Sequence, residues 1–192
     1  MHDEFVVFYA GRVGVGTSIA IITIAKAIEF LNCEGYNIKL QIQVPSLPDN
    51  IKYRLKPFKN TQINKYIDYY DLPSKLSSVD LLVLPMDFDK KNLSYIHLSM
   101  PTKVPEYMAS GTPILVFADK TTALANYASS ENWAFVVTEN SIISLIDQIK
   151  YIFKNKLERM EKAHHALQIV QKYHSGELIR ESFRNYFLQV LK

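Results

Sequence analysis

The chain alternates between short, continuous apolar runs and longer segments in which apolar residues recur at helical spacing. A run that is apolar at every position is typical of a strand buried on both faces, as in a parallel sheet. The clearest runs are Phe5–Ala10 and Asp80–Pro85, the second of which opens on a single acidic residue. In all, the pattern predicts six strands, at residues 5–10, 38–44, 63–67, 80–85, 114–117 and 133–137.

The segments between these runs are expected to be helices and connections. Thr17 or Ser18 can cap a helix that extends to about Leu31 and is apolar on nearly every face. Residues 46–60 and 87–101 show no helical period, which predicts an irregular connection and a polar loop. Further helical segments are predicted at 73–78 (a helix or a turn), 103–110, 121–128 and from 141 onward, ending in an amphipathic stretch at 177–191.

Strands that alternate with helices indicate βαβ units and therefore a parallel sheet. We predict an α/β fold, namely a Rossmann-like doubly wound parallel sheet of about six strands with helices on both faces. The length of 192 residues suits a single domain that covers residues 1–192.

Composition narrows the class of ligand and compartment. Hydrophobic residues make up 48% of the chain, enough for a full core, and the net charge of +3 suits a small anionic ligand better than nucleic acid. Cys33 is the single cysteine, so no internal disulfide can form, and we expect it to be buried at a helix end. The sequence start lacks a signal-peptide pattern, and no apolar run approaches the roughly 20 residues of a membrane span. These features predict a cytoplasmic protein.

The glycine-rich turn after the first strand is one candidate for chemistry. Backbone N–H groups in such a turn, with a helix N-terminus behind them, can bind phosphate. Gly11, Gly14 and Gly16 fit neither the dinucleotide-binding nor the Walker A pattern. Thr17 stands where Walker A needs a lysine. The turn is therefore either a tight bend that only glycine can make or a phosphate site in which Arg12 clamps the oxygens.

Residues 101–113 form the second candidate. Thr102 is a suitable N-cap for a short helix, and Pro105 is tolerated in a first turn, where N–H groups lack intrahelical partners. Free donors at this helix start, together with the positive charge of Lys103, suit a diphosphate. Glu106 lies about one turn further on, where a carboxylate can accept hydrogen bonds from two vicinal hydroxyls of a ribose. Taken alone, Lys103 or Glu106 would be interpreted as a solvated surface residue.

This segment resembles the donor-site segment of retaining glycosyltransferases with the GT-B fold, in the glycosyl transferases group 1 family. The residues that carry the resemblance are Lys103-Val104-Pro105-Glu106-Tyr107-Met108-Ala109-Ser110-Gly111-Thr112-Pro113-Ile114, where the family typically shows Glu-Ala-Met-Ala-x-Gly-x-Pro. Residues 8–13 resemble the opening strand and its Gly-Arg turn, and residues 71–85 resemble the segment that brackets the nucleotide base. The C-terminal helix over 177–192 resembles the helix that crosses back to the other domain.

The resemblance implies the C-terminal, donor-binding half of an enzyme that transfers a sugar from a nucleoside diphosphate sugar to an acceptor, as in polysaccharide biosynthesis. Glu106 would hold the ribose, and Arg12 and Lys103 would stabilise the diphosphate as it leaves with negative charge. His97 lies in the loop that faces the expected cleft, where it is either a contact to the sugar or an ordinary loop histidine. The full set of implied substrate-binding residues is Gly11, Arg12, Leu72, His97, Thr102, Lys103 and Glu106.

The resemblance also implies partners. The family works with two domains, so an N-terminal acceptor domain would supply much of the catalytic machinery, and the 192-residue chain alone is expected to transfer no sugar. The full enzyme could also associate with a membrane surface. No metal and no other cofactor are expected.

Two departures from the family pattern keep other functions open. A second family glutamate, eight positions before Glu106, is Leu98 here, and Gly14–Ser18 lack the lysine that often follows the Gly-Arg turn. Asp87 and Asp89 either supply a carboxylate in place of the missing glutamate or are solvated loop residues. The alternatives are a non-catalytic domain that binds a nucleotide or a protein and, against the glycine spacing, a dinucleotide oxidoreductase. A native reading frame with about 150–200 more residues upstream would favour the enzyme.

Overall fold

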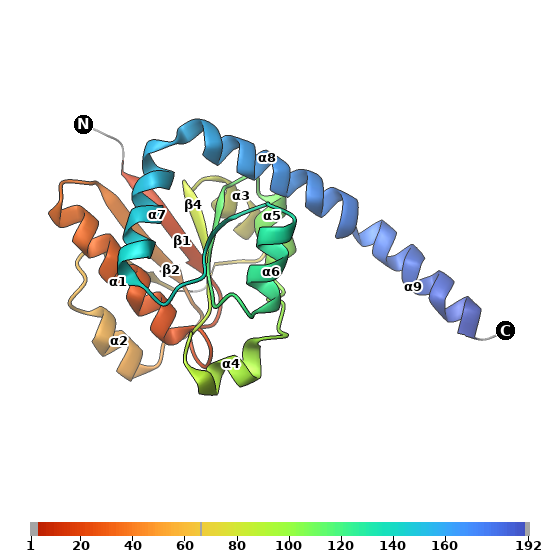
Figure 1. The fold of residues 1–192 in the computed structure, drawn as a ribbon, viewed down its shortest axis with the longest axis horizontal. Helices are drawn as coiled ribbons and strands as arrows, with labels where there is room; N and C mark the ends of the chain where they lie inside the picture. Colours follow the sequence, from red (N-terminus) through yellow and green to blue (C-terminus); the bar gives the residue numbers. More distant parts are fainter. Residues whose placement is uncertain (1–3, 66, 191–192) are drawn as a thin grey trace.

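The computed structural model describes residues 4–65 and 67–190 and shows a layered α/β arrangement (Figure 1). Within these residues the sheet has six strands in the order β3-β2-β1-β4-β5-β6, and all neighbouring strands are parallel. The predicted fold class, a Rossmann-like doubly wound sheet, is confirmed. The strands are β1 (Phe5–Ala10), β2 (Ile38–Gln43), β3 (Thr61–Asn64), β4 (Leu81–Pro85), β5 (Ile114–Phe117) and β6 (Phe135–Val137).

Helices cover both faces of the sheet (Figure 1). One layer consists of α1 (Ser18–Cys33), α2 (Asp49–Leu55) and α7 (Ile142–Lys154). The opposite layer consists of α3 (Leu72–Ser77), α5 (Val104–Ala109), α6 (Ala123–Ser130) and α8 (Lys156–Tyr173). α4 (Lys90–Ile96) follows β4 at the edge of the sheet where the strands end.

The two layers explain why the strands are continuous apolar runs. In β1, Val7 and Tyr9 point into the core beneath α1, whereas Phe8 points into the core on the other face. All residues of β4 and β5 are buried. A strand that is covered on both faces has no position at which a polar side chain would be solvated, so alternation disappears from its sequence.

The segment predicted to be an irregular connection contains α2. Ile51 and Leu55 are buried, and their four-residue separation places both on one face of the helix. Two anchoring residues in a seven-residue helix give too short a pattern to recognise among polar neighbours.

The segment predicted to be a polar loop contains α4. Asp89 caps this helix, because its carboxylate accepts a hydrogen bond from the Asn92 N–H at 3.1 Å. Ile96 is the buried residue of the helix and joins the core on the α5 face of the sheet. One apolar anchor per helix gives no periodic signal, so the sequence pattern missed it.

Other boundaries differ by a few residues. β3 ends at Asn64 rather than at 67, and residue 66 lies outside the described residues, as do 1–3 and 191–192. Thr17 precedes α1 but makes no side-chain cap hydrogen bond. Cys33 is exposed at the end of α1, so its predicted burial is wrong, because the helix turns that position toward solvent.

α9 (Gly176–Val190) continues from α8 away from the body of the molecule and has no buried residue (Figure 1). No helix within residues 4–65 and 67–190 is both long and apolar enough to cross a membrane. The assignment of this region as a helix that crosses to another domain stays a prediction. The large apolar side chains that α9 exposes are Leu178, Ile179, Phe183, Tyr186, Phe187, Leu188 and Val190.

The strand order places a switch point between β1 and β4. β2 and β3 extend the sheet on one side of β1, and β4, β5 and β6 extend it on the other. In open α/β sheets, ligands bind outside the carboxyl ends of the strands at such a point. The connections that follow β1 and β4 are therefore the first place to look for a site.

Candidate functional site

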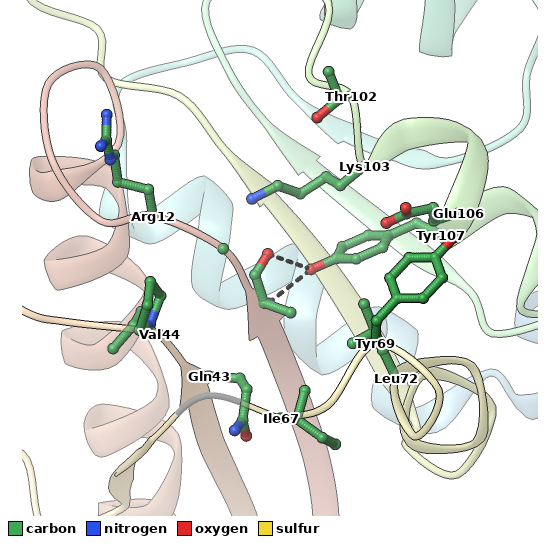
Figure 2. Close-up of a pocket in the computed structure, with 13 residues that line it drawn as sticks. Arg12, Gln43, Val44, Ile67, Tyr69, Leu72, Thr102, Lys103, Glu106 and Tyr107 are labelled. Carbon is green, nitrogen blue, oxygen red and sulfur yellow. Dashed lines mark hydrogen bonds between the residues drawn. The ribbon is translucent and has the colours of Figure 1, made fainter.

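A cavity of about 340 Å³ lies beside the carboxyl end of β1, at the switch point (Figure 2). Its walls come from the ends of β1 and β2, from the connection between β3 and α3, and from the start of α5. The lining residues are Ala10, Gly11, Arg12, Gln43, Val44, Pro45, Ile67, Tyr69, Leu72, Thr102, Lys103, Glu106 and Tyr107.

All but one of the residues predicted to bind substrate line this cavity. They come from three separate parts of the chain and meet only through the fold, and their roles as ligand contacts stay predictions. His97 is the exception, since it is exposed at the end of α4 and is not part of the lining. Its backbone carbonyl accepts a hydrogen bond from the Ala123 N–H at 2.6 Å, which ties the end of α4 to α6. The predicted residues in the lining are Gly11, Arg12, Leu72, Thr102, Lys103 and Glu106.

Lys103 brings an amine to the cavity from the start of α5, and Figure 2 shows its side chain extending toward the loop that carries Arg12. Its Nζ donates a hydrogen bond to Tyr9 Oη at 3.1 Å and lies 4.2 Å from the centroid of the Tyr9 ring. Burial lowers the pKa of Lys103 to about 8, against the opposing effect of the Glu106 carboxylate. The amine is short of compensating negative charge, so an anion in the cavity would stabilise its protonated form.

Gly11 makes room for this amine. A Cβ at position 11 would lie 2.1 Å from Lys103 Nζ, and the Gly11 φ of +140° belongs to the region that favours glycine. Its N–H donates to the Gln43 carbonyl at 3.0 Å, which fixes the turn to the end of β2. The positive φ therefore favours glycine at this position, and a Cβ there would displace the Lys103 amine from its place, a role that the sequence alone did not reveal.

Two tyrosines that sequence reasoning missed hold the turn in place. Tyr107 Oη accepts a hydrogen bond from the Ala10 N–H at 2.8 Å and donates one to the Ala10 carbonyl at 3.3 Å (Figure 2). Tyr9 Oη donates to the Arg12 carbonyl at 2.6 Å. Burial raises the pKa of Tyr9 to about 12 and that of Tyr107 still higher, so both hydroxyls stay protonated. For Tyr9, the signal in the sequence was a side chain with a polar tip inside an apolar run.

The start of α5 differs from the prediction. Lys103, not Thr102, is the N-cap residue, and it makes no side-chain cap hydrogen bond. Lys103 already has helical φ and ψ, and the first N–H of α5, that of Val104, donates to the Pro101 carbonyl at 3.0 Å. The backbone therefore offers fewer free donors than expected, and the side chains of Lys103 and Arg12 carry the positive charge of the cavity.

The N-terminus of α1, the other predicted phosphate site, is closed by Asp87. The Asp87 side chain is 1% exposed, and its Oδ1 accepts a hydrogen bond from the Ala20 N–H at 2.8 Å. Asn92 Nδ2 donates to the other oxygen of this carboxylate at 3.2 Å, and the nearby backbone N–H groups of Ile19 and Ser18 act to lower its pKa. Burial raises the pKa of Asp87. The donors expected to bind phosphate are thus used by a side chain of the chain itself, and Asp87 is not a solvated loop residue.

Gly16 allows Asp87 and α4 to pack closely against the start of α1. Its φ is +83°, and a Cβ there would lie 2.8 Å from Ile96 Cγ2. Its carbonyl accepts a hydrogen bond from the Asp87 N–H at 2.8 Å. The second half of the glycine turn is therefore a tight bend packed under α4, whereas Gly11 and Arg12 face the cavity.

A smaller apolar cavity of about 220 Å³ adjoins the first and shares Tyr69, Leu72 and Glu106 with it. Pro73 and Leu76 of α3 form part of its wall, in the segment predicted to bracket a nucleotide base. Leu98, at the position of the second family glutamate, is 79% exposed and lines neither cavity. Among residues 4–65 and 67–190, no group of three His, Cys, Asp or Glu side chains is placed to hold a metal ion.

No family model matches this chain, and no curated protein sequence does. Solved structures with the same fold exist. Sucrose-phosphate synthase from Thermosynechococcus elongatus covers 98% of the chain with a TM-score of 0.79 at 18% identity, and the match takes up 46% of that protein. A trehalose-6-phosphate protein from E. coli bound with UDP-2-fluoro glucose covers 88% with a TM-score of 0.67 at 13% identity, over 41% of its length. WaaG, a glycosyltransferase involved in lipopolysaccharide biosynthesis, covers 89% with a TM-score of 0.67 at 16% identity, over 44% of its length.

This chain therefore spans less than half the length of the structures that it matches. At such low identities the likeness establishes the fold. The resemblance found in the sequence is confirmed at that level, since the chain has the Rossmann-like fold of one half of a GT-B glycosyltransferase.

Proposed function

We propose that this chain is the donor-binding domain of a glycosyltransferase and that it binds a nucleoside diphosphate sugar in the cavity beside β1. The observation that carries the proposal is the convergence of Arg12, Lys103 and Glu106 on one cavity at the switch point of the sheet. Two cations and one carboxylate suit a ligand that has a diphosphate at one end and a ribose next to it.

Each end of the ligand has its own contacts in this proposal. The diphosphate lies against the Lys103 amine and the Arg12 guanidinium, next to the Cα of Gly11. Glu106 accepts hydrogen bonds from the ribose hydroxyls, and the base lies toward Leu72 and the apolar cavity beside α3. When the bond between the sugar and the diphosphate breaks, the leaving oxygen gains negative charge, which the two cations stabilise.

A second domain completes the enzyme in this proposal. The chain matches less than half of each solved structure, which leaves room in those proteins for another domain of similar size. We expect the acceptor to bind on that domain, so the 192-residue chain alone binds the donor and transfers no sugar. The setting implied is polysaccharide biosynthesis in the cytoplasm.

Calorimetric titration with a panel of nucleoside diphosphates and the matching nucleosides tests the proposal. At least one diphosphate should bind well and its nucleoside poorly, and Lys103→Met should remove most of that difference, since a hydrogen bond to a charged group contributes about 1.5–3 kcal/mol. The matched control is Lys52→Met, which removes an exposed lysine of α2 outside the cavity lining. Equal binding of diphosphate and nucleoside across the panel would refute the proposed site.

One observation favours a second function, a non-catalytic domain that binds a nucleotide. Position 98 carries an exposed leucine instead of the glutamate that many family members have, and neither cavity supplies a second carboxylate beside Glu106. The panel separates the two functions when sugar-linked diphosphates are included. A donor domain should bind one sugar nucleotide more tightly than the bare diphosphate, whereas a nucleotide-binding domain should bind the bare diphosphate at least as tightly.

A further inference from the structure

Tyr9 occupies an unusual position for a tyrosine. It lies in β1, is 1% exposed, and packs its ring in the core beneath α1. A buried phenol needs hydrogen-bond partners, and a phenylalanine would fill the same space without them. The hydroxyl is therefore the part of Tyr9 that calls for an explanation.

The hydroxyl of Tyr9 links the Lys103 amine to the backbone of Arg12. It accepts a hydrogen bond from Lys103 Nζ at 3.1 Å and donates its own hydrogen to the Arg12 carbonyl at 2.6 Å. The two bonds form one chain, because the hydroxyl oxygen accepts from the amine while the hydroxyl hydrogen is donated to the carbonyl. Lys103 comes from the start of α5 and Arg12 from the turn after β1, so the hydroxyl links two elements that are distant in sequence.

We propose that Tyr9 is the positioning residue of the anion site, and that its hydroxyl holds the Lys103 amine and the Arg12 backbone in place before a ligand arrives. The inference rests on the proposed function and adds a residue that acts through the cations and not on the ligand. A cation that is already in place costs less ordering when an anion binds.

The surroundings of the amine explain why one hydroxyl has this effect. Lys103 Nζ lies against Gly11 and the Tyr9 ring, and its amine is largely withdrawn from water. The Glu106 carboxylate on the same helix acts on the amine, Arg12 lines the same cavity, and Asp87 acts on the Tyr9 hydroxyl from the connection after β4. A hydrogen bond to the charged form favours that form, so the Tyr9 hydroxyl helps to keep the amine protonated.

Tyr9→Phe tests the inference, because it removes the hydroxyl and keeps the ring. The titration of Lys103 is followed by NMR of its side chain, with the signal identified by its loss in Lys103→Met. In Tyr9→Phe the titration midpoint of Lys103 should move to lower pH, and the preference for a nucleoside diphosphate over its nucleoside should fall about tenfold.

Tyr127→Phe is the control. It removes a tyrosine hydroxyl that hydrogen-bonds to His174 Nε2 at 2.7 Å outside the cavity lining, so it should leave the Lys103 midpoint and the diphosphate preference where they are. An unchanged Lys103 midpoint in Tyr9→Phe, with an unchanged preference, would overturn the inference and leave the proposed function standing. A wild-type chain that does not prefer the diphosphate would overturn both.

Discussion

Two positions at the carboxyl edge of this sheet look equally suited to a phosphate, and the chain treats them in opposite ways. At the start of α1, the carboxylate of Asp87 takes the backbone donors and Ile96 packs over the turn. At the start of α5, the Lys103 amine faces an open cavity. The start of α1 is thus filled by a carboxylate of the chain itself, whereas the cavity at the start of α5 presents an amine with room for an external anion.

A helix N-terminus can therefore serve as a ligand site only when the rest of the fold leaves its donors free. A carboxylate that is held in place by the chain meets α1 without any loss of translational freedom, which a free phosphate must give up.

Gly16→Ala should disturb the closed position most. A Cβ at positive φ costs about 1–2 kcal/mol, and overpacking against Ile96 adds about 1–3 kcal/mol, so the free energy of unfolding should fall by about 2–5 kcal/mol. Urea denaturation measures the loss. Gly35→Ala is the matched control, because φ there is also positive, at +92°, and nothing lies within 4 Å of the added Cβ. Equal losses in the two variants would mean that Ile96 does not press on the turn.

Asp87→Ala should destabilise the fold by about 1–3 kcal/mol, because it leaves the buried donors at the start of α1 without an acceptor. Asp87→Asn should cost less, since its amide oxygen can still accept the hydrogen bond from the Ala20 N–H. Chemical denaturation of both variants tests this order. If Asp87→Ala is as stable as the wild type, α1 does not depend on an internal cap.

Glu106→Ala should weaken binding of a nucleoside diphosphate roughly 10- to 150-fold, because each hydrogen bond to a carboxylate contributes about 1.5–3 kcal/mol. The fold should be unaffected, since Glu106 is exposed. Calorimetric titration measures the change, with Glu161→Ala, an exposed carboxylate of α8 outside the cavity lining, as the control. Unchanged affinity in a folded Glu106→Ala variant would show that the ribose binds elsewhere.

Lys103 should make binding depend on pH in a defined direction. With a pKa of about 8 in the ligand-free protein, the amine loses its charge as pH rises through that value. If the protonated amine is the form that binds, diphosphate affinity should fall by about tenfold between pH 7 and pH 9. Calorimetry at several pH values measures this fall, which should vanish in Lys103→Met.

The lowered pKa of Lys103 should make the free energy of unfolding depend on pH in the opposite direction. Because its pKa is lower in the folded than in the unfolded chain, the unfolded chain binds more protons between about pH 8 and pH 10.5. The contribution of Lys103 to the free energy of unfolding should therefore rise with pH across that window. Denaturation of the ligand-free wild type and of Lys103→Met should converge toward the upper end, and a constant difference would contradict the lowered pKa.

Arg12→Met should have the smallest effect. Arg12 is exposed, so water and salt screen its charge over about 8 Å at physiological ionic strength, and the expected loss of diphosphate affinity is about two- to fivefold. Titration at low and high salt should show that the loss shrinks as salt rises. A loss that does not change with salt would indicate that Arg12 supports the turn and does not pair with phosphate.

The pattern of apolar residues was enough to predict the architecture. The apolar runs at β1, β4 and β5 are long enough and continuous enough to predict buried parallel strands, and the alternation with helices then leaves few arrangements. The sequence also predicted that one ligand is contacted by Gly11, Arg12, Lys103 and Glu106. Successive parallel strands end at the same edge, so residues that follow them are placed together whatever lies between.

Which of the two possible phosphate-binding positions stays open depends on the tertiary structure. The bonds between Asp87 and Ala20, and between Lys103 and Tyr9, join residues that are far apart in the sequence. Neither pair leaves a periodic pattern or a fixed spacing, because each depends on how the connection after β4 folds back over β1. Local propensity acts over a few residues, whereas burial, hydrogen bonding and pKa depend on every group that the fold brings within a few ångströms.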